Sequence, residues 1–250
     1  MYNGTLATLD EFPGIANVII GFNGFAKSCT GTLITNEAVL TAAHCLEKDG
    51  VLGLAVNSFV GVDSLQDALN NNKTIRVKKL EVYPGYFTNN LEDLGIVHLD
   101  RRYDNLRAST IKVVGEHVLH NTKLSAAGWG ATEDSSNEQS TKNRGRLLKK
   151  IDFSVTQYPL VGRTVALALI NKKVFCAKVE DGQALGSGDS GGPAVVDVNG
   201  AKLQAGISAL SLSWMDPGIS SFEFSCFVNV FNYINWIASV IGVSPDELIG

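Results

Sequence analysis

One serine in this chain has neighbours that suit nucleophilic catalysis. Ser190 lies in the run GDSGGP at residues 188–193, where glycines let backbone amides come close to a bound electrophile. A serine hydroxyl is a weak nucleophile near neutral pH, so it needs a base within hydrogen-bond reach and a third group that orients the base. His44, in the run TAAHC at residues 41–45, is the candidate base, because imidazole ordinarily titrates near pH ~6.5. The two runs predict acyl transfer through a serine nucleophile.

Together, the two runs resemble those of the trypsin/chymotrypsin family of serine endopeptidases, in the same chain order. That order requires an acid between the histidine and the serine. Asp93 opens the run DLGIVHL at residues 93–99, which resembles the family's DIALLxL strand, with Gly95 where alanine is usual. Glu92 is the adjacent alternative, but a shift by one residue would turn the side chains to the opposite face of the strand. The resemblance therefore implies a triad of His44, Asp93 and Ser190.

The resemblance also implies an oxyanion hole in the serine run. The backbone amides of Gly188 and Ser190 would donate to the oxygen that becomes negative during attack, each donor supplying about 3 to 4 kcal/mol in comparable sites. A glycine-rich hairpin with an incidental serine is the non-catalytic alternative. All six positions of the run, together with the histidine run, favour the catalytic interpretation.

The elements that would position these residues are mostly strands. Short segments that alternate or run apolar between turn signals predict strands over residues 17–21, 32–40, 75–82, 124–127 and 194–198. Apolar residues at three- and four-residue steps predict a helix over residues 229–242. With 250 residues, the all-β chain has room for two barrels.

The resemblance implies two antiparallel six-stranded β-barrels, chymotrypsin-like, followed by a C-terminal α-helix. We expect a first domain at residues 1–112, carrying His44 and Asp93, and a second at residues 113–250, carrying Ser190 and the substrate pocket. The crossover is placed near residues 105–114.

The substrate pocket is implied by alignment with the family. Ala184 would form the floor of the pocket, and Ser208 and Ala209 would lie in the strand that pairs with the substrate backbone. Leu210 would form the rim and Ser225 the far wall. An apolar floor and a bulky rim favour small to medium apolar residues at P1, the substrate residue before the scissile bond. Glu180 or Glu223 is the alternative determinant, because the segment 212–222 is long and either carboxylate could enter the pocket and select basic residues.

Two disulfides are expected among the four cysteines. The resemblance pairs Cys29 with Cys45, which braces the histidine loop. Cys176 lacks the family's usual partner, and the register set by the C-terminal helix puts Cys226 on the neighbouring strand, so we expect a nonstandard Cys176–Cys226 bridge. Two buried free thiols are the alternative, because cross-strand geometry is restrictive.

The first residues resemble the family's activated N-terminus. Residues 1–5, MYNGT, are similar to IVGGT, with Met1 in the place of the amine that pairs with the aspartate before the nucleophile. We expect the Met1 ammonium to be buried against Asp189, where a hydrogen-bonded ion pair would be needed. The start has no basic and apolar leader, so we interpret the chain as a mature form.

Several other partners are excluded by composition and spacing. A net charge of −4 argues against nucleic acid, and the apolar runs are too short to span a membrane. The family's calcium hairpin would be residues 61–79, but Val62 and Asn72 stand at the ligand positions. His117 and His120 have no evident third ligand. We therefore expect neither metal nor cofactor.

These observations predict a secreted, monomeric serine endopeptidase that acts on protein or peptide substrates and meets protein inhibitors. Disulfides and the sequons at Asn3 and Asn72 favour an extracellular protein, and of the two only Asn72 looks exposed. The alternative is a catalytically silent homologue of the same fold that binds a partner protein.

Overall fold

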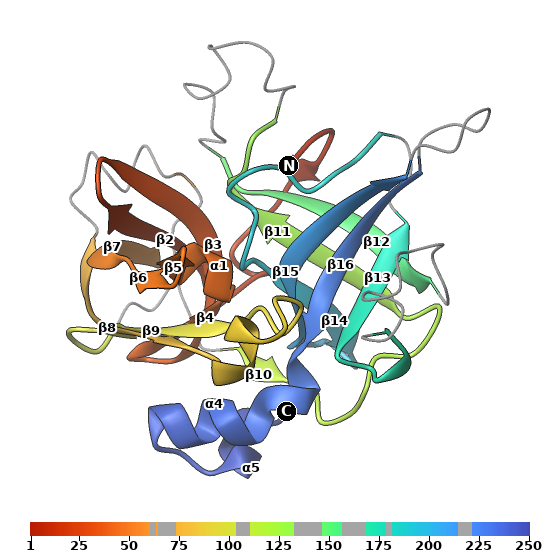
Figure 1. The fold of residues 1–250 in the computed structure, drawn as a ribbon. Helices are drawn as coiled ribbons and strands as arrows, with labels where there is room; N and C mark the ends of the chain where they lie inside the picture. Colours follow the sequence, from red (N-terminus) through yellow and green to blue (C-terminus); the bar gives the residue numbers. More distant parts are fainter. Residues whose placement is uncertain are drawn as a thin grey trace.

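A computed structural model describes residues 1–60, 64, 74–103, 111–132, 147–156, 169–178, 182–214 and 222–250. Strands dominate these residues and form two main sheets, with short helices at the C-terminus (Figure 1). The expected all-β architecture with a C-terminal helix is confirmed. No helix in the described ranges is both long and apolar enough to cross a bilayer.

The first sheet is a closed barrel in the order β2-β3-β4-β9-β8-β7. Its strands are β2 (Ile15–Phe22), β3 (Phe25–Thr35), β4 (Ala38–Thr41), β7 (Leu54–Val60), β8 (Ile75–Val82) and β9 (Gly95–Leu99). The short hairpin of β5 (Glu47–Lys48) and β6 (Val51–Leu52) lies between β4 and β7 in the chain. The predicted strand at residues 32–40 is two strands, because a turn at Asn36 and Glu37 separates β3 from β4.

The second sheet follows the order β1-β12-β11-β14-β15-β16-β13, and β12 also pairs with β13, so the sheet curls round on itself. Its strands are β1 (Thr5–Leu6), β11 (Lys123–Gly128), β12 (Lys149–Thr156), β13 (Val174–Lys178), β14 (Pro193–Val198), β15 (Ala201–Trp214) and β16 (Phe222–Asn229). The short strand β10 (Lys112–Val113) pairs with β15 in parallel. Alternation explains β12, where Ile151, Phe153 and Val155 are buried and the residues between them are exposed.

The C-terminal helices pack on the first barrel, although they follow the second sheet in the chain (Figure 1). The predicted helix at 229–242 is a 3-10 turn at Val230–Tyr233 (η2) followed by α4 (Ile234–Ile241), which Gly242 ends in the left-handed conformation, φ 74°. A capping box at Ser244 and Glu247 starts α5 (Pro245–Leu248).

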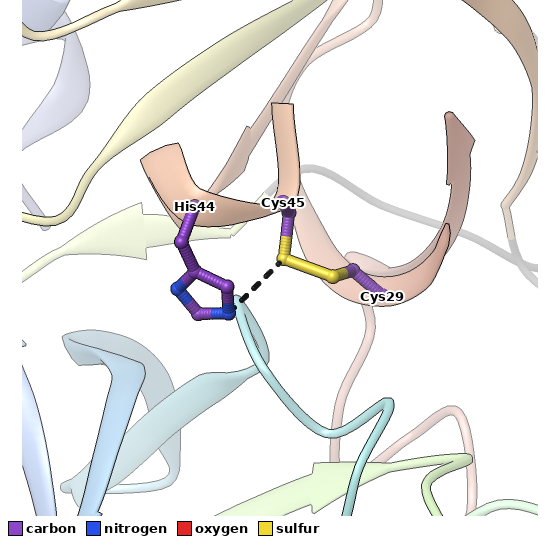
Figure 2. Close-up of side chains that lie close together, drawn as sticks. All are labelled: Cys29, His44 and Cys45. Carbon is purple, nitrogen blue, oxygen red and sulfur yellow. Dashed lines mark hydrogen bonds between the residues drawn. A yellow bond between two sulfur atoms is a disulfide. The ribbon is translucent and has the colours of Figure 1, made fainter. Parts of the chain in front are cut away.

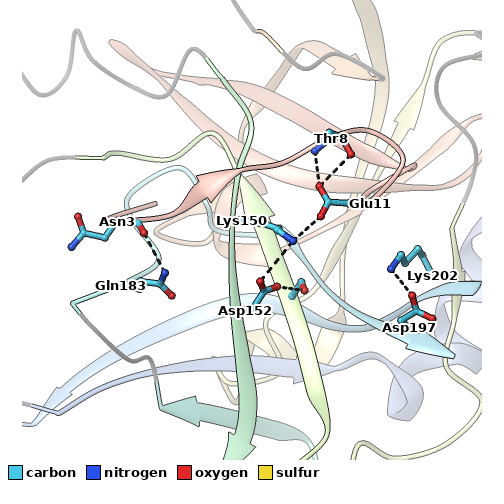
Figure 3. A network of polar contacts seen from close by, with 9 residues as sticks. Asn3, Thr8, Glu11, Lys150, Asp152, Gln183, Asp197 and Lys202 are labelled. Atoms are coloured by element: carbon cyan, nitrogen blue, oxygen red, sulfur yellow. Dashed lines mark hydrogen bonds and ion pairs between the residues drawn. The ribbon is translucent and has the colours of Figure 1, made fainter. Parts of the chain in front are cut away.

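The N-terminal segment lies on the second sheet, even though the predicted first domain begins at residue 1. Thr5 pairs with Lys150 across β1 and β12. The ammonium of Lys150 forms an ion pair with Glu11 at 2.6 Å, and Glu11 also accepts a hydrogen bond from the backbone N of Thr8 (Figure 3). Asn3, expected to be covered, is exposed; Asn72 lies outside the described residues.

Candidate active site

His44 is positioned by a short helix and a disulfide. It lies in α1 (Ala43–Leu46), whose other side chains are buried. The expected Cys29–Cys45 disulfide is present and ties α1 to β3, with 6.2 Å between the Cα atoms. Figure 2 shows one ring nitrogen of His44 turned toward the sulfur of Cys45; Nε2 lies 3.8 Å from that Sγ.

Asp93 lies two residues before β9 and orients the His44 ring. The backbone N of His44 donates to Oδ1 of Asp93 at 2.8 Å, and Nδ1 donates to Oδ2 at 2.6 Å. The Asp93 side chain is 6% exposed and that of His44 is 31% exposed. Because Nδ1 carries its proton toward the carboxylate, the outer nitrogen Nε2 is the one left to accept a proton.

Glu92, the adjacent carboxylate, has a different partner. Its Oε1 forms an ion pair with the ammonium of Lys173, which precedes β13. These two consecutive residues therefore have different partners, Asp93 with His44 and Glu92 with Lys173.

The serine run is held through its carbonyl groups. Thr30, on β3, donates from its backbone N to the Ser190 carbonyl at 2.9 Å and from Oγ1 to the Gly188 carbonyl at 2.9 Å. Within the described part of the chain, the backbone N–H groups of Gly188 and Ser190 donate no hydrogen bond. Gly188 has φ 104°, a conformation that glycine adopts without steric cost.

Gly191 and Gly192 join the serine run to β15. Gly191 N donates to the Ser208 carbonyl at 2.7 Å, and Ser208 N donates to the Gly192 carbonyl at 2.8 Å. A Cβ on Gly191 would lie 2.1 Å from Oγ1 of Thr41, so no larger residue fits without displacement. In the described residues, no hydrogen bond joins Ser190 Oγ to His44 Nε2.

The amino group of Met1 lies beside the serine run. Its nitrogen is 2.8 Å from Oδ2 of Asp189, both side chains are fully buried, and the amine also donates to the Ala131 carbonyl. Asp189 additionally accepts from Gly130 N at 2.7 Å and from Gly186 N at 2.8 Å. The buried carboxylate therefore has several donors around it, as a buried charge requires.

An apolar pocket of about 180 Å³ lies next to His44. Leu91, Val174, Leu210 and Cys226 are among the residues that line it, together with the polar side chain of Asp93. The register of β15 and β16 shifts between Ser208 and Leu210, so Ala209 is the extra residue of a β-bulge and also lines the pocket.

The comparisons with known proteins agree with this geometry. The sequence matches the family described as Trypsin over residues 2–237. The chain belongs to the trypsin family. It is 26% identical to phenoloxidase-activating enzyme 1 of Spodoptera litura, over 98% of this chain and 67% of that protein. It is also 26% identical to chymotrypsin-like elastase family member 1 of Rattus norvegicus, over 86% of this chain and 79% of that protein.

A solved structure, that of HL collagenase, shares the fold. Its TM-score is 0.72 over 98% of this trypsin-family chain and 100% of the other, at 19% sequence identity. The expected chymotrypsin-like fold is therefore confirmed. Relatives of this chain are serine proteases, whereas the identity to each is low.

The predicted substrate residues are only partly brought together at the pocket. Ala209 and Leu210 line it, whereas Ala184, Ser208 and Ser225 do not. Ala184 instead pairs with Tyr2, whose backbone N donates to the Ala184 carbonyl at 2.8 Å. Glu180 and the side chain of Glu223 lie outside the described residues.

Sequence reasoning missed four residues that line the pocket, namely Tyr86, Asn90, Leu91 and Val174. Three of them lie within seven residues before Asp93, and that closeness in the chain is the signal that could have found them. Burial raises the pKa of the Tyr86 hydroxyl to about 12, and the nearby carboxylates of Asp93 and Glu47 add to the effect. Tyr86 is therefore a neutral phenol at the pocket edge.

The second disulfide closes one wall of this trypsin-family site. Cys176 on β13 and Cys226 on β16 are direct cross-strand partners and are bonded, with 4.0 Å between their Cα atoms. Because Cys226 lines the pocket, this nonstandard bridge fixes part of the pocket wall.

The two histidines considered as metal ligands have separate partners. His117 accepts a hydrogen bond from Asn229 at 3.2 Å, while His120 contacts the Val155 carbonyl at 3.0 Å. Among the described residues, the one cluster with metal-ligand spacing is Cys29, His44 and Cys45, whose cysteines are bonded to each other. A disulfide offers no thiolate to a metal. Val62 and Asn72, at the positions of the family's calcium ligands, lie outside the described residues.

Proposed function

We propose that this chain is a secreted serine endopeptidase that cleaves peptide bonds through a triad of His44, Asp93 and Ser190. The observation that carries the proposal is the double contact of Asp93 with the backbone and Nδ1 of His44, which orients the ring and leaves Nε2 as the nitrogen that can accept a proton. A histidine that acts as general base needs a third group to hold its ring in the right orientation and tautomer, and Asp93 makes the contacts that this role requires.

The proposed reaction uses each of these residues in turn. Nε2 of His44 takes the proton of the Ser190 hydroxyl as its oxygen attacks the substrate carbonyl, and Asp93 stabilises the resulting imidazolium. The negative carbonyl oxygen accepts hydrogen bonds from the amides of Gly188 and Ser190. His44 then gives its proton to the leaving amine, which departs, and an acyl-enzyme on Ser190 remains. Water attacks this ester by the same steps and frees the serine.

Small to medium apolar residues are the proposed choice at P1. Ala184 brings no charge to the implied pocket floor, and the cavity beside His44 is lined by the apolar side chains of Leu91, Val174 and Leu210. Asp93, the carboxylate in that lining, is already paired with His44, so a cation desolvated there would lack a free carboxylate partner, which is unfavourable. Protein substrates and protein inhibitors are the proposed partners.

Secretion is supported by the two disulfides, because such bonds persist in oxidising compartments. Each closes a large loop of the chain, with sequence separations of 16 and 50 residues.

A catalytically silent homologue that binds a partner protein is the second candidate. One observation favours it: Nε2 of His44 faces Sγ of Cys45 at 3.8 Å, and within the described chain it has no hydrogen bond to Ser190 Oγ. In a free enzyme this bond is often long and tightens only when substrate is bound.

A serine-directed diaryl phosphonate with an apolar P1 group separates the two candidates. The peptidase proposal expects one adduct per chain on Ser190, located by mass spectrometry, with no adduct in Ser190→Ala and almost none in His44→Ala. Folding of each variant is checked by circular dichroism. An unlabelled but folded parent protein overturns the peptidase proposal and supports the binding one.

A further inference from the structure

We propose that Lys27 and Lys48 make this enzyme prefer substrates with an acidic side chain just after the scissile bond. The inference rests on the proposed peptidase function and names a selectivity of the same site. Neither lysine lines the cavity beside His44, and Lys27 instead contacts the backbone carbonyl of His44.

The leaving group, which is the substrate segment after the scissile bond, must lie where its amine can accept a proton from His44. Sγ of Cys45 lies 3.8 Å from His44 Nε2 and 3.8 Å from the Ser190 carbonyl oxygen, so the Cys29–Cys45 disulfide borders that side of the serine. Strand β3 carries Cys29 and passes along the serine run through Thr30, whereas Ala209 and Leu210 belong to β15. The leaving group therefore faces the disulfide and β3.

Lys27 lies on β3 near the Cys29–Cys45 disulfide and contacts His44. It lies two residues before Cys29 on β3, so both side chains point to the same face of the strand. Its ammonium donates to the backbone carbonyl of His44 at 2.6 Å. That contact uses one of three N–H donors and leaves two for a bound group.

Lys48, Phe22 and Phe25 lie close to Lys27 and form one surface with it. The rings of Phe22 and Phe25, at the turn end of β2 and β3, stack with centroids 5.2 Å apart. The Lys27 ammonium lies 5.6 Å from the centre of the Phe22 ring, and the Lys48 ammonium lies 4.6 Å from that of Phe25. The aromatic pair thus supports both cations at one edge of the first barrel.

No direct ion pair neutralises these two lysines within the described chain. Neither lysine has a carboxylate within ion-pair distance among the described residues. Glu47, the neighbour of Lys48, is buried and accepts a hydrogen bond from Gly50 N. Burial lowers the pKa of Lys27, and the positive charge of Lys48 lowers it further, whereas Asp93 and Glu47 oppose the change.

Two neighbouring cations, one of them partly buried, are unfavourable for folding alone. A carboxylate bound between them would relieve the repulsion and gain charge-assisted hydrogen bonds. A peptide leaving group can bring that carboxylate as an Asp or Glu side chain.

The test compares peptides that share an apolar residue before the scissile bond and carry Glu, Gln or Lys at the first or second position after it. In the parent enzyme, we expect kcat/KM for the better Glu peptide to exceed that for its Gln twin by about 5- to 10-fold, a ratio that falls as salt rises. Lys48→Gln should lower the ratio, and Lys48→Glu should reverse the order of the Glu and Lys peptides. Lys123→Gln, a change of an exposed lysine on β11, should leave the ratio unaltered.

Lys27→Arg and Lys27→Met separate charge from packing, since only the second variant should lose the Glu preference. If Lys27→Met does not fold, the Lys48 variants still decide the matter. The phosphonate adduct on Ser190, which carries no residue after the scissile position, keeps the two proposals apart. A parent protein that labels but cleaves the Glu and Gln peptides equally overturns this inference alone. A folded parent that does not label overturns the peptidase proposal beneath it.

Discussion

The amino nitrogen of Met1 lies 2.8 Å from Oδ2 of Asp189, with both side chains fully buried. Asp189 immediately precedes Ser190, and its oxygens also accept hydrogen bonds from Gly130 and Gly186. A free amine at Met1 therefore forms a buried ion pair that fixes the backbone next to the nucleophile. We expect this contact to support the backbone geometry of Gly188, two residues before the nucleophile.

Blocking or extending the Met1 amine should disable the site. With the amine acetylated, or with one residue added before Met1, Asp189 keeps its charge and loses its cationic partner. We expect phosphonate labelling of Ser190 to fall at least about 100-fold, because loss of one partner of a buried pair costs about 3 to 5 kcal/mol. Asp197→Asn, which breaks a surface pair with Lys202, is the control and should label normally. Equal labelling of extended and parent chains would show that the contact does not govern the nucleophile.

Gly191→Ala should unfold or inactivate the protein far more readily than Gly200→Ala. Both glycines have positive φ, 80° and 87°, so both substitutions place alanine in an unfavourable backbone conformation. A Cβ at Gly200 meets nothing within 4 Å, whereas one at Gly191 lies 2.1 Å from Thr41 Oγ1 and 2.3 Å from the Thr30 carbonyl. Urea denaturation should show a loss of about 1 kcal/mol for Gly200→Ala and at least about 3 kcal/mol for Gly191→Ala. Similar losses at the two positions would contradict the close packing of the serine run.

Peptides with Ala, Val or Leu at P1 should be cleaved faster than those with Arg or Lys. The expected difference in kcat/KM is at least about 10-fold, because a desolvated cation without a carboxylate costs several kcal/mol. Ala184→Asp should narrow the difference by raising the rate for Arg. If the parent cleaves faster after Arg and Ala184→Asp adds little, a carboxylate such as Glu223 or Glu180 serves the pocket instead.

The ion pair between Glu11 and Lys150 should make a small, pH-dependent contribution to stability. The hydrogen bond that Lys150 donates to Glu11 lowers the pKa of Glu11 from the ordinary value of 4.5. A lowered folded pKa means that the contribution is complete above the unfolded value of 4.5 and disappears as pH falls through the folded value. Because the pair is partly exposed and screened, Glu11→Gln should lower the free energy of unfolding by only about 0.5 kcal/mol near pH 7. Urea denaturation of parent and variant near pH 7 and near pH 3 measures the difference. An equal loss at both pH values would mean that the carboxylate charge is not its cause.

Much of the fold and the candidate site could be predicted because the signals are local. The strand at residues 75–82 follows from alternation along one segment, and it matches β8 at both ends. Both cysteine pairs could be anticipated from motifs and register. The order of His44, Asp93 and Ser190 is likewise a property of the chain, and so is the glycine at each crowded position of the serine run.

Other features depend on contacts between residues far apart in the chain. Leu91 and Val174 meet in the pocket across the two sheets, and Ala209 turns toward it only because β15 and β16 shift register. The N-terminal strand lies on the second sheet, and helix α4 lies on the first barrel, where its apolar face is buried.

The sequence by itself determined which residues can do chemistry and in what order, because residue type and short-range spacing decide nucleophilicity, turns and strand alternation. Only the tertiary structure decided that Glu92 pairs with Lys173, and that Leu91 and Val174 line one pocket beside His44. Those pairings are decided by packing and charge burial across the whole fold, which no local pattern encodes.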